Sequence, residues 1–171
     1  RAKELIADSL STMALGAAEP EGRSLRQYVR ELQGGTGPCA IMGADFSAHP
    51  ALAAFANAAQ TQIHDANDGW PMAEVTNVCA HAGRLIIPTA LASTAARGGT
   101  GRDLITAVVA GCEFAGRAQR MTQTTRDTYV SAVAAGKVAG FDAGQLSQAL
   151  VMAAYMSPGR AGLPGPRIDE Y

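Results

Sequence analysis

The sequence predicts an all-α protein: one compact multi-helix bundle over residues 1–156, followed by a Pro/Gly-rich tail over residues 157–171. Apolar residues recur at the 3.6-residue spacing of a helix in nearly every periodic segment, and none alternates with the two-residue period of a strand. Apolar residues make up 47% of the chain but aromatic residues only 5%, which favours closely packed helices lined by small side chains. Two capping-box sequences mark helix starts in the second half.

The first part of the chain contains two predicted helices and a linker. Residues 3–18 carry five apolar residues near a 3.6-residue period, and the Glu-Pro-Glu-Gly sequence at residues 19–22 breaks the pattern. A short second helix is predicted from Ser24 to a Gly-Gly pair. Residues 37–46 are predicted as a linker that is extended at most over residues 40–42. Strand content should therefore be minimal.

A third helix is predicted from Ser47, with Pro50 tolerated in its first turn. His49 precedes this proline, and we interpret it as a surface or capping residue and not as a catalyst. The buried stripe of this helix is predicted from its apolar spacing to be Leu52, Phe55, Ala56, Ala59 and Ile63.

Four later helices complete the prediction. Residues 83–97 and 128–140 are helical by their apolar pattern, and the other two helices begin at the capping boxes. The boxes are Thr100-x-x-Asp103 and Asp142-x-x-Gln145. The Gly-Gly-Thr-Gly sequence at residues 98–101 is a weak anion-site signal, because no strand precedes it and a turn with an N-cap explains it.

Charge and cysteine content exclude several classes of function. The formal net charge is −1 and the basic residues are scattered, so we expect neither nucleic acid nor a membrane as a partner. No apolar run approaches the roughly 20 residues of a membrane span. The three cysteines, Cys39, Cys79 and Cys112, are far apart and read as reduced thiols. These features predict a soluble, cytoplasmic protein.

The polar residues that follow the third helix are the candidates for chemistry. Asp65 and Asp68 lie three apart with Asn67 between them, and His81 follows a loop that contains Trp70. A carboxylate and a nearby histidine that apolar side chains partly cover can act as a general acid/base pair. Short polar side chains that cap a helix-end turn explain the same spacing. A dinuclear metal site would need more ligands than the few remaining His and Asp residues supply, so no metal is expected.

In order along the chain, three segments resemble the MmgE/PrpD family. Residues 49–69 are similar to an Ala-rich helix that leads into Asp-Phe-Asp-Asp-Thr, and Asp65, Asn67 and Asp68 fall on its three Asp positions. Residues 81–117 resemble the next family segment, matching it at His81, Pro88, Glu113 and Arg117. Residues 128–159 resemble its Thr-rich helix start, Ala-rich helix and Gly-Leu-Asp-x-x-Gln repeat.

The family includes 2-methylcitrate dehydratase, cis-aconitate decarboxylase and iminodisuccinate epimerase. The resemblance therefore implies a helical domain, a homodimer, and small di- or tricarboxylate substrates. It makes Asp65 and His81 the leading catalytic residues. The chain departs from the family pattern at Gln62, Gly69 and Ala82, and it is less than half the length of family members, whose second half supplies a lid domain and further catalytic groups.

These observations predict an enzyme that moves a proton next to a carboxylate or carbonyl, in a dehydration, decarboxylation, isomerisation or cyclisation. Asp65 and His81 would share the acid/base work, and Asp68 and Asn67 would orient them. The remaining assignments are water exclusion by Trp70 and binding of a substrate carboxylate by Arg84 and Arg117. No cofactor is expected. The alternative is a non-catalytic ligand-binding or scaffold subunit that needs a partner chain.

Overall fold

The computed structural model describes residues 1–66, 81–118 and 123–157, with the side chains of residues 123–126 left out. Among the described residues, the regular secondary structure is helical apart from one pair of two-residue strands, which confirms the predicted all-α class. The helices are α1 (Ala2–Ala18), α2 (Pro20–Gln33), α3 (Pro50–Gln62), α4 (Gly83–Ala96), α5 (Gly101–Arg117), α6 (Gln123–Ala139) and α7 (Ala143–Met156), and β1 (Cys39–Ala40) pairs antiparallel with β2 (Ser47–Ala48).

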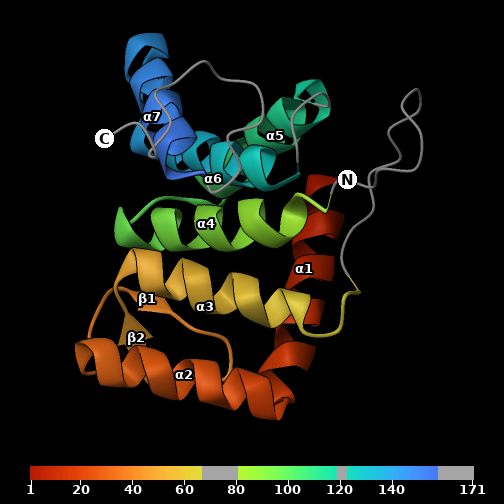
Figure 1. Cartoon of the computed structure of the whole chain (residues 1–171), viewed down its shortest axis with the longest axis vertical. Coiled ribbons are helices and arrows are strands. Elements are labelled where there is room, and N and C mark those ends of the chain that lie inside the picture. Colours follow the sequence, from red (N-terminus) through yellow and green to blue (C-terminus); the bar gives the residue numbers. More distant parts are fainter. Residues whose placement is uncertain (67–80, 119–122, 158–171) are drawn as a thin grey trace, which may run out of the picture.

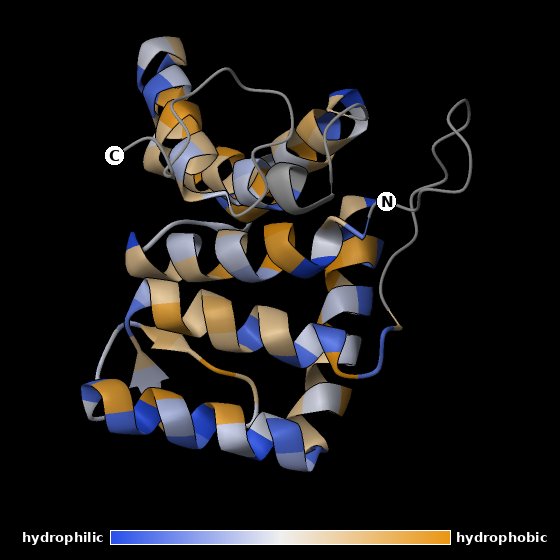
Figure 2. Cartoon of the chain, viewed as in Figure 1, coloured by the Kyte–Doolittle hydropathy of each residue, from blue (hydrophilic) through white to orange (hydrophobic). Residues whose placement is uncertain are grey.

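The helices form a layered bundle (Figure 1). Helices α2, α3 and α4 lie one above the other, α1 crosses the ends of this stack, and α5, α6 and α7 lie on the far side of α4. Figure 2 shows hydrophobic residues concentrated on α3, α4 and the helices beyond them, whereas α2 is largely hydrophilic. Among the described residues, no helix is long and apolar enough to cross a membrane.

The predicted helix starts in the second half are confirmed. The hydroxyl of Thr100 accepts a hydrogen bond from the Asp103 backbone N–H, and the Asp103 carboxylate accepts one from the Thr100 backbone N–H. Asp142 and Gln145 form the same reciprocal pair at the start of α7. His49 is a cap, as predicted, because its Nδ1 accepts from the Ala51 N–H at 3.3 Å.

Two predicted boundaries in the first half were wrong. Helix α2 begins at Pro20 and not at Ser24, because a proline at the first helical position loses no hydrogen bond that the helix would have made. The extended residues are 39–40 and not 40–42, since they pair with Ser47–Ala48, a segment predicted to be helical. The helical period did not supply this pairing, which joins residues seven and nine positions apart across a loop.

The predicted buried stripe of α3 was right only in part: Ala56 is buried and Leu52 packs half-buried against the core, but the pattern missed most of the buried residues. Phe55 is 49% exposed. The buried residues are Ala53, Ala56, Asn57, Gln60 and Thr61. The two amides face inward because they bond the backbone of the 40–42 segment: Asn57 Nδ2 donates to the Ala40 carbonyl at 3.1 Å and Gln60 Nε2 to the Met42 carbonyl at 3.3 Å. A polarity pattern assigns such amides to solvent, but a buried amide with hydrogen-bond partners is stable in a core.

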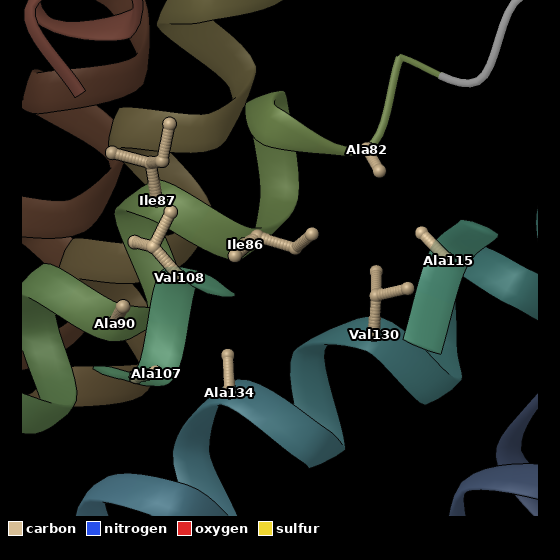
Figure 3. Packing of buried hydrophobic residues seen from close by; sticks show 9 residues of the cluster. All are labelled: Ala82, Ile86, Ile87, Ala90, Ala107, Val108, Ala115, Val130 and Ala134. Carbon is tan, nitrogen blue, oxygen red and sulfur yellow. The ribbon is translucent and has the colours of Figure 1, made fainter. Parts of the chain in front are cut away.

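The core has two clusters of buried hydrophobic residues. The first lies between α4, α5 and α6 (Figure 3) and consists of Ala82, Ile86, Ile87, Ala90, Ala107, Val108, Ala115, Val130 and Ala134. Most are alanines, which lets the helix backbones approach closely, and Cys112 packs against this cluster. The second surrounds β1, α2 and α3 and includes Cys39. Burial raises the pKa of the Cys39 thiol, whose Sγ donates to the Ala92 carbonyl at 3.2 Å.

Candidate active site

Asp65 lies in the turn that ends α3. Its backbone N–H donates to the Gln62 carbonyl at 3.0 Å, and its φ of 50° is in the left-handed region that residues other than glycine seldom adopt. The side chain is exposed, and its Oδ1 accepts a hydrogen bond from Gln62 Nε2 at 2.8 Å. The turn therefore presents a carboxylate to solvent while an amide from the preceding helix holds it in one orientation.

His81 lies directly before α4, and Arg84 in the first turn of that helix connects it to the end of α3. Arg84 Nε donates to the His81 carbonyl at 3.2 Å, and Nη1 donates to Gln62 Oε1 at 2.6 Å. Because Gln62 also bonds Asp65, one arginine links the two leading catalytic candidates. The bond to Gln62 crosses from α4 to α3, and these two helices pack side by side.

The guanidinium of Arg84 also makes an ion pair with Asp127 near the start of α6. Its Nη2 lies 2.5 Å from Asp127 Oδ2, and the two side chains are only 19% and 18% exposed. We name Asp65, Gln62, His81, Arg84 and Asp127 together the Arg84 network. A partly buried charged hydrogen bond is stronger than one on the surface, so Asp127 fixes the position of the guanidinium.

Asp127 was missed in the sequence. The available signal was weak: Asp127 is the only acidic residue between Glu113 and Asp142, in a stretch that contains several arginines. An isolated acid among bases often pairs with one of them. Its partner nevertheless lies 43 positions earlier in the chain, and only the packing of α4 on α6 brings the two together.

Of the other predicted site residues, Arg117 lies within the described part of the chain, and it does not join this network. Arg117, in the last turn of α5, is 84% exposed and lies 3.5 Å from Glu113, one helical turn away. Asn67, Asp68 and Trp70 are outside the described residues.

Next to the site, His64 contacts Glu19 at 3.2 Å, where α1 meets α2. His64 therefore serves the junction between these helices. Within the described ranges, no three His, Cys, Asp or Glu side chains gather closely enough to hold a metal ion.

Comparison with protein families supports the resemblance that the motifs predicted. A model of the MmgE/PrpD N-terminal domain matches residues 1–162. The chain belongs to the MmgE/PrpD family. The predicted resemblance and its limit to the N-terminal helical domain of the family are thus confirmed. The MmgE/PrpD family includes lyases and dehydratases. A search of curated proteins found no match to this chain.

Proposed function

We propose that this MmgE/PrpD chain is an acid/base enzyme that removes or delivers a proton at a carbon next to a carboxylate or carbonyl. The observation that supports this most directly is the Arg84 network, in which one guanidinium holds both the His81 backbone and the amide that orients Asp65. Asp65 and His81 share the roles of base and acid, and Asp68, Asn67 and Trp70 complete the site. The substrate is a small polycarboxylate or keto acid.

The proposed chemistry has one step common to several reactions. Proton removal next to a carbonyl or carboxylate leaves negative charge on that carbon and its oxygen atoms. Loss of a β-hydroxyl, return of the proton to the opposite face, or ring closure can follow, and decarboxylation ends with protonation of the same kind of carbanion. As part of the proposal, the enzyme works in a reducing cytoplasm, as its three separated cysteines predict.

The test is hydrogen exchange in heavy water, followed by NMR across a panel of small polycarboxylates and β-keto acids. We expect deuterium to enter one carbon position of at least one compound faster with the folded protein than with the same protein after unfolding. The exchanging compound then defines the substrate class. If no compound exchanges above the unfolded control, the proposed acid/base function is wrong for this panel's chemistry.

A second candidate function is a non-catalytic ligand-binding or scaffold subunit that needs a partner chain, and the surface of α7 favours it. The exposed fractions are 55% for Val151, 67% for Met152, 77% for Tyr155 and 78% for Met156. Among the described elements, α7 packs on α6 and on no other helix. Such a cluster of exposed apolar side chains is typical of an interface. Binding of a panel compound without exchange would support this candidate.

We propose a second copy of the chain as the partner of α7, because residues 143–156 carry no charge and so do not repel their own copies across a two-fold axis. Light scattering after size exclusion should give twice the mass of one chain. The double variant Met152→Glu/Tyr155→Glu should be a monomer, while Val109→Glu, which alters an exposed apolar residue of α5, should stay a dimer. A monomeric wild type, or a dimer that survives the double variant, contradicts this.

A further inference from the structure

We infer that Arg84 is a positioning residue, anchored by Asp127, that orients Asp65 through Gln62 and holds the backbone at His81, and that it is not the ligand of a substrate carboxylate. This inference rests on the proposed function, because it gives Asp65 and His81 the acid/base roles. It changes the role first predicted for Arg84 and assigns a role to Asp127 and Gln62.

The charge of Arg84 is already matched within the fold. Asp127 Oδ2 lies 2.5 Å from Nη2, in a pair whose side chains are each less than one-fifth exposed. A substrate carboxylate would have to compete with a carboxylate that belongs to the same chain and is held next to the guanidinium at all times. Arg117, by contrast, is 84% exposed and its pair with Glu113 is long, so the two arginines differ in role.

The hydrogen bonds of Arg84 determine which way the Gln62 amide faces. An arginine can only donate hydrogen bonds, so Nη1 must meet the amide oxygen of Gln62 and not its NH2 group. The NH2 group then points to Asp65 Oδ1, 2.8 Å away, and donates to the carboxylate. A reversed amide would place two donors together at Arg84 and two acceptors together at Asp65. Arg84 thereby fixes the orientation of the Gln62 amide, and the amide in turn orients the Asp65 carboxylate.

The same guanidinium also bonds the backbone at His81. Nε donates to the His81 carbonyl at 3.2 Å, which ties the residue before α4 to the first turn of that helix. Asp65 has a φ of 50°, in the left-handed region that aspartate adopts in turns more readily than most residues other than glycine. Three helices therefore supply one rigid frame for two acid/base groups: α3 through Gln62, α4 through Arg84 and α6 through Asp127.

Kinetics separate positioning from substrate binding, because the two roles predict opposite effects of Asp127→Asn. If Arg84 positions the site, both Asp127→Asn and Arg84→Gln lower kcat for the exchanging compound by about 10- to 100-fold and change KM by less than about threefold. If Arg84 binds substrate, Asp127→Asn frees it and lowers KM, while Arg84→Gln raises KM about 100-fold. That second pattern would overturn the inference. Asp45→Asn, which breaks the exposed ion pair of Arg30 outside the Arg84 network, is the matched control and should change neither constant by more than about twofold.

A measurement without turnover keeps this test separate from the test of the proposed function. In NMR spectra of the free protein, Asp127→Asn should shift the side-chain NH2 signals of Gln62 and the carboxyl carbon of Asp65, whereas Asp45→Asn should shift neither. A double-mutant cycle with Gln62→Leu should use the shift of the Asp65 carboxyl carbon as its readout. Arg84→Gln should change that shift little once Gln62→Leu has removed the amide. If Asp127→Asn leaves the Gln62 and Asp65 signals in place, Arg84 does not position the site, whether or not the protein is an enzyme.

Discussion

His81→Ala is expected to slow deuterium incorporation into the exchanging substrate about 10²- to 10⁴-fold, the usual contribution of one general acid or base. The imidazole would give up or accept the proton next to the carboxylate, and alanine can do neither. The fold should survive, because His81 precedes α4 and its backbone carbonyl, which accepts from Arg84, is kept in the variant. The measurement is the initial exchange rate in heavy water, with circular dichroism as the check on folding.

His49→Ala is the matched control for this experiment. It also removes an imidazole, but one that caps the start of α3 and is remote from the Arg84 network in sequence. Exchange should continue at nearly the wild-type rate in His49→Ala. Asp65→Asn should lower the rate strongly, and the double variant His81→Ala/Asp65→Asn should be little slower than the worse single variant, because residues that act as one unit are not additive. Full activity of His81→Ala would exclude it as the acid or base.

Gly16→Ala is expected to have the largest effect on stability, lowering the free energy of unfolding by about 3 kcal/mol or more. Gly16 lies where α1 crosses α3. A Cβ atom added there would be 2.0 Å from the backbone carbonyl oxygen of Gln60, and a backbone atom in a packed helix cannot turn aside as a side chain can. The two helices would have to separate. Urea unfolding gives the change as a shift in midpoint at constant slope.

Gly116→Ala is the matched control for this substitution. It is the same change within a helix, but a Cβ atom at Gly116 of α5 would meet nothing within 4 Å. Alanine has the higher helix propensity, so Gly116→Ala should raise the free energy of unfolding by about 0.5 kcal/mol. If Gly16→Ala unfolded at the wild-type midpoint, α1 and α3 would not approach each other as closely as described.

Structural features that depend only on residues a few positions apart were predictable from the sequence. The capping boxes at Thr100 and Asp142 act across three positions, and both were found in the structure as predicted. The break at residues 19–22 was seen, but it turned out to be a junction between two helices. The buried face of α3 was not predictable from polarity, because the NH2 groups of its core amides Asn57 and Gln60 donate to a segment about 17 positions earlier.

The candidate site divides in the same way. Asp65, His81 and Arg84 were found from their spacing and from the family motifs, since those motifs are contiguous in the chain. The sequence did not predict the ion pair of Arg84 with Asp127 or the exclusion of Arg117 from the network. Both depend on how α4 packs against α5 and α6.

Most helices and their caps follow from residues close together in the chain, because hydrogen bonds within a helix connect residues three or four apart. The family follows from the order of its motifs along the chain. Which charge neutralises Arg84, and therefore what that arginine can do, was decided by tertiary packing. Coulombic and hydrogen-bond energies depend on distance in space, and folding brings residues 43 positions apart to within 2.5 Å.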